Sequence, residues 1–369
     1  MRPISFTVVM TIIIAGFLSM MPENIDAGDP PNKGLETPLP PPGFEVHKGP
    51  MNPGRPIRSQ GKAYNGPIFD THAHMHYKRK FSSESKLPEE ILATARKNGV
   101  ERQIFLPTPN EGRFRNLDTN LNLRRQILKI GGKGVGLLCG SEYLTVWMEG
   151  IFHRGYTEED LDKHFALLDR DLNNGQCVGV GEIGPYHFEK KRGQNVIKFP
   201  LNFTPFLKMV GIVAEKKVWL DLHVEPMTPK GRSYEDEVFG GIALLYRLFP
   251  ELRLVLSHSS MTNSKNARAL LDTYPNLMMN LKAVLSGKSL AWDNLGPITN
   301  GKAELFEDWA TLFEAMPDRF MIGTDFRWGE KPSKKYRKRI KGMRRNLGSL
   351  DPAVAVKIAH KNAQRVFGN

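Results

Sequence analysis

The chain has 369 residues, of which 40% are apolar and 25% charged. This composition permits a large buried core, and it excludes a disordered chain, a collagen and a polytopic membrane protein. Lys and Arg outnumber Asp and Glu by 52 to 39, a formal net charge of +13, which favours anionic partners. Cys139 and Cys177 are the two cysteines and lack the CxxC spacing of a metal or redox motif, so we predict two buried thiols, with a disulfide as the alternative.

The amino terminus has the pattern of an export signal. Arg2 precedes an apolar and hydroxyl run from Val8 to Met21, which is too short to cross a bilayer but suits the core of a signal peptide. We expect residues 1–27 to be removed after Ala27, leaving a secreted or periplasmic protein without a stable membrane span. An uncleaved amino-terminal anchor is the alternative.

Residues 28–66 contain nine prolines and seven glycines and show no hydrophobic period. We expect a linker or a wrapping arm there, followed by one domain at residues 67–369. Short apolar, β-branched runs alternate with segments of helical spacing throughout that domain. The predicted strands are 68–74, 103–106, 135–139, 178–183, 218–223, 252–257, 277–280 and 320–324. The predicted helices are 87–98, 119–130, 157–172, 205–217, 238–249, 264–274, 304–316, 334–347 and 352–367.

Eight strand-helix repeats in about 300 residues predict a closed (β/α)8 TIM barrel of the α/β class. An open doubly wound sheet is the alternative, but no glycine-rich phosphate loop follows the first strand. Active sites of such barrels lie at the carboxyl ends of the strands. Histidines and acids stand at five of these ends: Asp70, His72 and His74 on the first strand, then Glu182, Asp221 with His223, His258 and Asp325.

Period-two geometry points Asp70, His72 and His74 to one side of the first strand. Two imidazoles on one strand face can chelate one ion. Zinc, manganese and iron accept imidazole and carboxylate ligands, and an open coordination position lowers the pKa of a bound water toward about 7. We expect zinc first, with one or two ions. Asp70 and Asp221 would orient the ligands from below.

The motif order resembles that of the amidohydrolase superfamily. Ile322-Gly323-Thr324-Asp325-Phe326 and the closing stretch 359–368 are similar to the amidohydrolase-related family, whereas Gly181-Glu182-Ile183-Gly184 is similar to a motif of TatD-type nucleases. Pro185-Tyr186 follows, without the acid usual in the nuclease group. The resemblance implies metal positions at His72, His74, His223, His258 and Asp325, and a role for Glu182 in holding a second ion.

We therefore predict a metal-dependent hydrolase that cleaves an amide, ester or lactone bond of a small molecule. Asp325 would accept the proton of the attacking water. His258 would bind a second ion or stabilise the charge that develops on the substrate oxygen, and the sequence does not separate these roles. His187 and Arg327 are candidate substrate contacts. The alternatives are a decarboxylase of the same family, using Arg327 to bind a carboxylate, and a non-catalytic polyanion-binding protein.

Residues 327–345 hold ten basic residues and one acid. Apolar residues at helical spacing predict an amphipathic helix that starts at the mouth of the barrel and runs away from it. We expect Arg327, Lys331, Lys334 and Lys335 to lie near the mouth and to steer an anionic substrate, whereas Arg339, Arg344 and Arg345 would lie farther away. No specific nucleic acid is expected as a partner, and the sequence leaves a homo-oligomer open.

Overall fold

The computed structural model describes residues 35–46, 54–57, 62–75, 87–113, 117–188, 196–228, 230–282, 298–300, 304–329 and 333–368. Gly34–Asn369 form one compact unit. The predicted signal peptide lies outside the described residues. Among the described helices, none combines the length and the apolar character that a membrane span requires.

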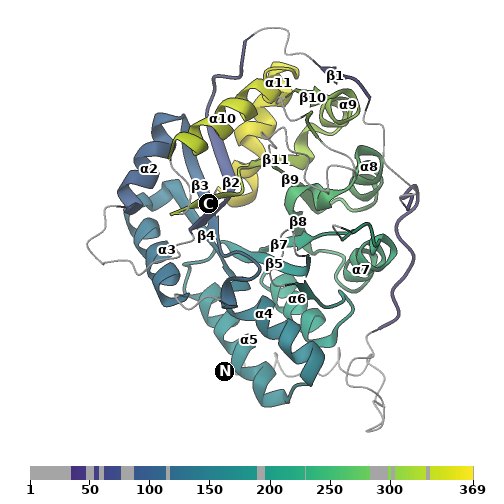
Figure 1. The fold of residues 1–369 in the computed structure, drawn as a ribbon. Helices are drawn as coiled ribbons and strands as arrows, with labels where there is room; N and C mark the ends of the chain where they lie inside the picture. Colours follow the sequence, from purple (N-terminus) through teal and green to yellow (C-terminus); the bar gives the residue numbers. More distant parts are fainter. Residues whose placement is uncertain are drawn as a thin grey trace, which may run out of the picture. The chain divides into compact units, whose positions relative to one another are not determined.

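Nine parallel strands follow one another in the described sheet, in the order β11-β9-β8-β7-β5-β4-β3-β2-β12 (Figure 1). Each of the eight predicted strands is present within a few residues of its expected position. The bounds are β2 Ile68–Met75, β3 Val100–Leu106, β4 Val135–Gly140, β5 Gly179–His187, β7 Trp219–Val224, β8 Arg253–Leu256, β9 Leu277–Lys282, β11 Phe320–Gly323 and β12 Phe326–Trp328.

The ring of strands closes through β12, which the sequence did not predict. This strand begins three residues after β11 ends and pairs in parallel with β2, with Phe326 opposite Ala73. The amide of Asp325 donates to the carbonyl of His72 at 2.7 Å, and the hydroxyl of Thr71 donates to the carbonyl of Ile322 at 2.8 Å. The last strand of the fold is therefore joined to the first, and the predicted (β/α)8 barrel is confirmed.

Helices surround the barrel, with each predicted helix found and one added (Figure 1). The added helix is α4, which contains β-branched Thr145 and Val146 and a glycine at 150, all poor helix formers. It forms because Leu144, Met148 and Ile151 are buried. The bounds are α2 Leu87–Lys97, α3 Leu117–Gly131, α4 Ser141–Arg154, α5 Glu158–Asn173, α6 Thr204–Glu215, α7 Glu235–Leu248, α8 Ser264–Thr273, α9 Glu307–Ala315, α10 Ser333–Leu347, α11 Pro352–Val356 and α12 Asn362–Phe367.

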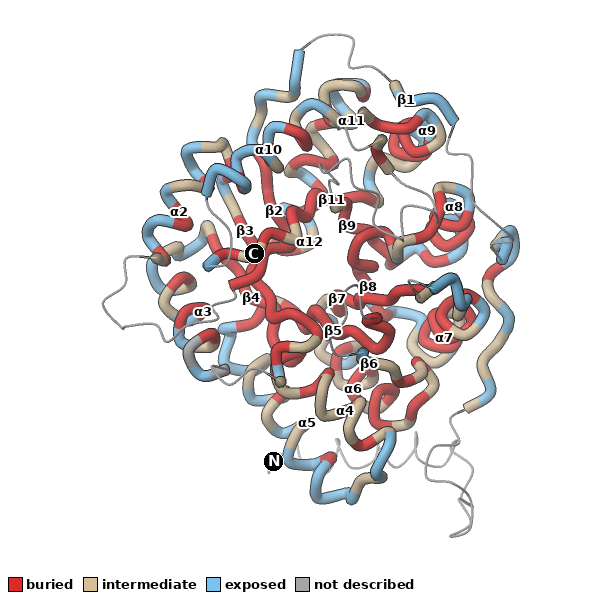
Figure 2. Tube along the Cα trace, in the orientation of Figure 1, coloured by how far each residue is buried: buried red, intermediate tan, exposed pale blue. Residues whose placement is uncertain are grey.

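The strands are buried along almost their whole length, as the red ring of Figure 2 shows. An apolar cluster includes Phe69, Leu138, Val255 and Met321 from the strands together with Phe367 of α12. The polar side chains discussed below are displaced from this cluster toward the carboxyl ends of the strands. The barrel thus provides a rigid apolar base for its polar end.

The described parts of the proline-rich segment are an arm packed on the barrel rather than a free linker. The ring of Phe44 lies 4.4 Å from that of Phe239 on α7, and the amide of Glu45 donates to the side chain of Asn266 on α8 at 3.0 Å. Further along, β1 (Pro56–Ile57) pairs with β10 (Leu305–Phe306), just before α9. The arm therefore runs across three neighbouring helices.

The prediction of two free thiols is wrong, because Cys139 and Cys177 form a buried disulfide with a Cα separation of 5.9 Å. β4 and β5 pair in parallel, with Cys139 opposite Val180. The segment that leads into β5 therefore brings Cys177 beside β4. A sequence separation of 38 residues gave no sign of this pairing.

Candidate metal centre

The six side chains predicted as metal ligands meet at the carboxyl ends of the strands. Their donor atoms form overlapping groups in which all members lie within 4.8 Å of one another. Five of the six residues are buried, and the side chain of Asp325 is 13% exposed. The residues are His72, His74, Glu182, His223, His258 and Asp325.

Glu182 lies at the middle of this group. Its Oε2 atom is 3.5 Å from Nε2 of His72 and 3.6 Å from Nε2 of His74. Its Oε1 atom is 2.6 Å from Nδ1 of His223 and 3.5 Å from Nε2 of His258. Burial would raise the pKa of Glu182, but the neighbouring imidazoles of His72 and His223 hold it well below its ordinary value. The carboxylate therefore stays charged between two pairs of histidines.

Asp325 extends the group beyond β11. Its Oδ1 atom lies 3.0 Å from Nε2 of His74, and its Oδ2 atom contacts the ammonium of Lys282. Burial would raise the pKa of Asp325, but the ammonium of Lys282 holds it well below its ordinary value. The backbone of Asp325 is left-handed, with φ of 47°, and this turn redirects the chain between β11 and β12.

The donor atoms fit a divalent cation. Nδ1 of His74 lies 3.0 Å from the carbonyl of Leu106, which can only accept, so this nitrogen carries the proton in the neutral ring and the Nε2 lone pair faces two carboxylates. Nε2 of His72 is buried and makes no hydrogen bond to any described residue. Ligands of one tetrahedral zinc are about 3.3 Å apart, since the bonds are about 2.0 Å long. The spacings of 3.5 and 3.6 Å around Glu182 are close to this value.

Polar side chains beneath the ligands hold His72 and His258 in place. The side-chain amide of Asn280 lies 3.2 Å from Nδ1 of His72 and donates to Asp221 at 3.2 Å. Its oxygen accepts from the amide of His258 at 2.9 Å. Ser257 also donates to Asp221. Asp221 thus has the expected supporting place under His72, at 3.7 Å from Nδ1.

Asp70 supports the backbone rather than an imidazole. It accepts the amide of Thr324 at 2.8 Å and its hydroxyl at 2.7 Å, and it accepts the amide of His72 at 3.4 Å. Asp70 therefore ties β2 to the turn that carries Asp325. Gly323 permits this close approach, because a Cβ there would lie 2.8 Å from that of His72.

His223 is held by a second carboxylate that the sequence did not suggest. Oε1 of Glu225 lies 3.0 Å from Nε2 of His223, and Oε2 accepts the amide of Phe188 at 2.7 Å. Glu225 is fully buried. His187, predicted as a substrate contact, lies beside His223 with ring centroids 5.1 Å apart. Glu225 therefore fixes the ring of His223 and the end of β5 together.

Arg327 has the predicted place at the mouth. It lies opposite His74 in the pairing of β12 with β2, while its neighbours Phe326 and Trp328 pack outward on Tyr336 of α10. Alternation along the strand therefore turns Arg327 toward the candidate metal ligands.

The expectation that Arg339 lies far from the mouth is wrong. Its guanidinium donates to the carbonyl of Asp325 at 2.8 Å and to that of Thr324. Side chains on a helix lean toward its amino terminus, so Arg339 reaches back along α10 to the turn. Arg344 instead donates to the carbonyls of Gly66 and Asn98, at 2.8 and 3.0 Å, which lie at the opposite end of the barrel. Lys331 lies outside the described residues.

A buried ion cluster holds the loop after β3. Arg124 donates to Glu111 at 2.6 Å and lies 3.5 Å from Glu142 at the start of α4. Glu111 also accepts the amide of Thr108 at 3.2 Å. Burial raises the pKa of Glu142 to about 7, with Arg124 acting against the rise.

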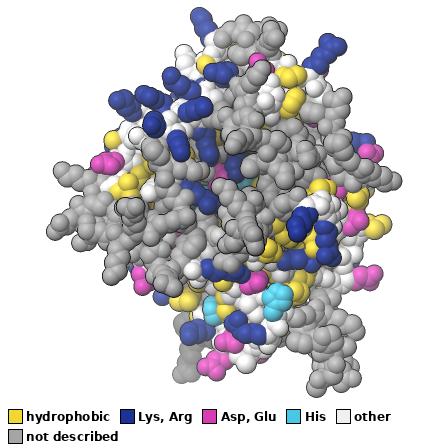
Figure 3. Space-filling view, in the orientation of Figure 1, with side chains coloured by type: hydrophobic (Ala, Val, Ile, Leu, Met, Phe, Trp, Pro, Cys, Tyr) yellow, Lys and Arg dark blue, Asp and Glu magenta, His cyan; other side chains and the backbone are white. Residues whose placement is uncertain are grey.

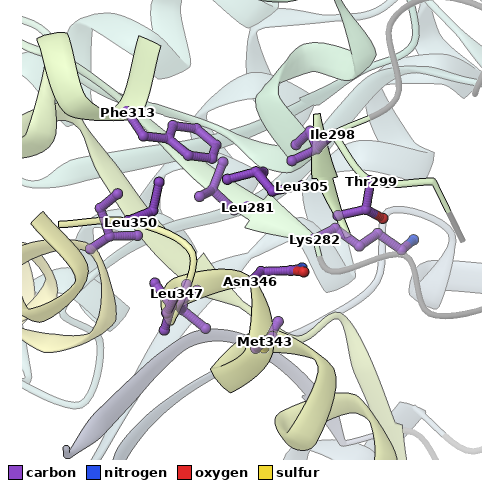
Figure 4. Close-up of a pocket in the computed structure, with 12 residues that line it drawn as sticks. Leu281, Lys282, Ile298, Thr299, Leu305, Phe313, Met343, Asn346, Leu347 and Leu350 are labelled. Carbon is purple, nitrogen blue, oxygen red and sulfur yellow. The ribbon is translucent and has the colours of Figure 1, made fainter. Parts of the chain in front are cut away.

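Lys282 also borders a small apolar cavity of about 30 Å³. Leu281, Leu305 and Phe313 line it, and Lys282 runs along its edge with the ammonium turned away from them (Figure 4). The cavity has room for about one water molecule. It is too small for a substrate, but it shows that the lysine stem packs on apolar residues while its charge is directed at Asp325.

A parallel barrel with imidazoles and carboxylates gathered at the carboxyl ends of its strands is the architecture of a metal-dependent enzyme. Residues 192–368 match the family model described as amidohydrolase. This match, over the second half of the barrel, supports the resemblance expected from the sequence, and the protein is an enzyme. No curated protein matches the chain in sequence.

The chain is similar to solved structures at low sequence identity. A 4-oxalomesaconate hydratase from Rhodopseudomonas palustris is 13% identical with a TM-score of 0.50, over 82% of this chain and 95% of that one. A probable 2-pyrone-4,6-dicarboxylic acid hydrolase from Acinetobacter baumannii is 13% identical with a TM-score of 0.46, over 82% and 99%. An amidohydrolase from Burkholderia multivorans with bound zinc is 10% identical with a TM-score of 0.47, over 82% and 99%.

Proposed function

We propose that the protein hydrolyses an amide, ester or lactone bond of a small anionic molecule, with two divalent ions that Glu182 and the histidines around it would hold. The position of Glu182 carries this proposal, because each of its two oxygens faces its own pair of imidazoles. His72, His74 and Asp325 would hold one ion, and His223 and His258 the other.

Zinc is the expected metal, and manganese and iron are the alternatives for the same donors. A divalent ion there would supply Lewis acidity toward water and a substrate carbonyl. Burial and the charge of Lys282 hold the pKa of His258 well below its ordinary value. A neutral His258 suits a metal ligand, and it could also donate a hydrogen bond to the oxygen of the scissile group. Asp325 is the carboxylate at the open end, where it would accept the proton of the attacking water.

Charge at the mouth supports an anionic substrate. Arg327 turns toward the ligands, and Lys282 and Arg339 flank Asp325. Lys and Arg side chains gather over α10 on the face that Figure 3 shows. Lys334→Glu should lower kcat/KM in a manner that weakens with added salt, because steering is screened over about 10 Å at 0.1 M salt. The matched reversal Arg345→Glu, at the far end of α10, should leave kcat/KM unchanged.

Decarboxylation is the second candidate, and Arg327 favours it. A guanidinium beside a metal centre can bind a substrate carboxylate in a bidentate manner. Turnover in ¹⁸O-labelled water separates the two reactions, because hydrolysis places the label in the product. Release of carbon dioxide without incorporation would establish the decarboxylase instead.

Metal analysis of the purified protein, combined with a panel of amide, ester and lactone substrates, tests the proposal. Wild type should contain two transition-metal ions per chain. Replacing both His72 and His74 with Ala should lower the metal content and abolish turnover. The control is the double variant of His153 and His164, which lie on the outer helices α4 and α5. A double variant of His72 and His74 that keeps its full metal content would refute the site.

We further propose export with removal of residues 1–27, giving a periplasmic or secreted enzyme. The disulfide between Cys139 and Cys177 supports this location, since disulfides persist in oxidising compartments. Amino-terminal sequencing of the protein from its native source should read from Gly28. An intact Met1 would contradict the cleavage.

A further inference from the structure

We propose that the outer face of α10 binds an acidic polysaccharide through a line of lysine and arginine side chains, independently of the metal centre. The helix carries eight cations and no acid over Ser333–Leu347. Two of them, Arg339 and Arg344, turn inward onto backbone carbonyls. The remaining six, which we call the α10 stripe, are all exposed: Lys334, Lys335, Arg337, Lys338, Lys341 and Arg345.

The α10 stripe is linear. Lys334, Lys338, Lys341 and Arg345 follow the spacing i, i+4, i+7 and i+11, which places them on one face of a helix. They extend over about 16 Å, since a helix rises 1.5 Å per residue. The opposite face is buried against the barrel through Tyr336, Ile340, Met343 and Leu347.

These charges oppose the stability of the helix. Like charges four residues apart cost about 0.2–0.5 kcal/mol per pair, and Lys334 and Lys335 stand in the first turn, where the helix dipole favours acids. The helices α5 and α7 show the usual arrangement, with three acids each in their first turns. A bound polyanion would relieve the repulsion along α10.

The stripe also differs from three lysines elsewhere on the surface. Lys208, Lys216 and Lys357 each pair with a carboxylate, at distances of 2.7–3.0 Å. Among the described residues, Lys338 and Lys341 have no carboxylate within ion-pair distance. Their positive charge is therefore available to a ligand from outside the chain.

The chemistry of the face favours a polysaccharide over a membrane or a nucleic acid. The large apolar side chains that are exposed in the described chain are Leu39, Val46, Ile130 and Val196, none of which lies on α10. The helix therefore presents no residue to insert into a bilayer, and no exposed aromatic ring on which bases could stack. Because α10 lies flat on the barrel, it presents only charge and cannot enter a groove of a duplex. A polymer of regularly spaced carboxylates or sulfates needs nothing more than charge.

The experiment measures binding of fluorescein-labelled heparin to the full metal-loaded enzyme by fluorescence anisotropy. The test variant is R337Q/K338Q/K341Q, and the control is K208Q/K216Q/K357Q, which removes the same charge from ion-paired lysines. We expect the test variant to raise Kd at least tenfold and to reduce the salt slope by about two to three, while the control changes Kd less than twofold. The Tm of the test variant should not fall, since repulsion is removed.

Three outcomes would overturn the proposal. Equal losses in the two variants would show a response to net charge alone, and no loss in the test variant would leave the stripe without a role. Tighter binding of a 20-base-pair duplex, or of vesicles rich in phosphatidylserine, than of heparin at the same salt would identify a different polyanion. None of these readouts measures metal content or turnover. Failure of the proposed hydrolase function would therefore appear in the metal analysis and the substrate panel, and not in the heparin binding.

Discussion

Lys282 and Asp325 extend from the ends of two neighbouring strands and meet, with the lysine ammonium on the carboxylate oxygen that His74 does not use. The carboxylate placed to accept a proton is thus also paired with a cation. This pairing keeps Asp325 ionised, because Lys282 lowers its pKa, and a charged carboxylate is the form that can bind a metal and accept a proton.

Asp325→Asn should therefore reduce kcat by at least about 10²-fold, as removal of a general base does. The amide cannot take a proton from water, although it preserves the shape of the side chain. The matched control is Asp318→Asn, which changes an exposed ion pair with Lys357 below β11. Steady-state kinetics with the substrate found in the panel gives the comparison. A near wild-type kcat in the Asn variant would contradict the role of Asp325 as base.

Glu182→Gln should reduce the metal content from two ions per chain to one. A neutral amide offers one weak metal-ligand atom in place of two charged oxygens. The variant would therefore be unable to help hold an ion on each side. Elemental analysis after dialysis against a fixed free zinc concentration measures the change. One ion in the wild-type protein would show that Glu182 supports a single centre.

Glu225→Gln should weaken metal binding about 10- to 100-fold, the usual effect of losing a carboxylate that orients a ligand histidine. Glu237→Gln is the control, because Glu237 accepts the hydroxyl of Tyr186 at 2.5 Å and pairs with Lys198 instead of a candidate metal ligand. Chelator competition measures the affinity. Loss of one whole ion instead of weaker binding would make Glu225 a ligand itself, and equal affinities would remove its role.

Replacing both Cys139 and Cys177 with Ser should lower the free energy of unfolding by about 3–4 kcal/mol in the loop-entropy model, since the disulfide closes a loop of 38 residues. Urea unfolding of the oxidised and the dithiothreitol-reduced wild type, beside the double Ser variant, measures the change. The reduced wild type should match the variant. Equal stability of all three samples would contradict a stabilising disulfide.

Stability should depend on pH through Glu142. Its pKa rises from 4.5 to about 7 on folding, so the native state holds a proton that the unfolded state has lost between these values. The stabilising proton is lost as pH rises, and stability falls across this range, by about 3 kcal/mol at most. Glu142→Gln should remove this part of the decline. Urea unfolding at pH 5 and pH 8 gives the difference, and parallel declines in both proteins would refute it.

The sequence predicted the barrel and all six candidate ligands, because strand ends and the period of two place such residues on one face. It missed Lys282, since the predicted strand stopped at Asn280 and left the lysine in a loop. Glu225 lies two residues after His223 and on the same face of the strand. The same period-two spacing that identified His72 and His74 could therefore have identified Glu225. The direction of α10 alone puts Arg339 far from the mouth, but its long side chain leans back toward the amino terminus of the helix and reaches the turn at Asp325.

The closure of the ring by β12 bears on the order in which the site can assemble. His72 and His74 belong to the first barrel strand, whereas Asp325 belongs to the turn that joins the last two strands. Residues 192–368 supply His223, His258 and Asp325, and the other three ligands come from earlier in the chain. No fragment short of the whole ring can hold the complete set. Under the proposed function, metal binding by a refolding chain would therefore report the final folding step, in which the two ends of the barrel meet.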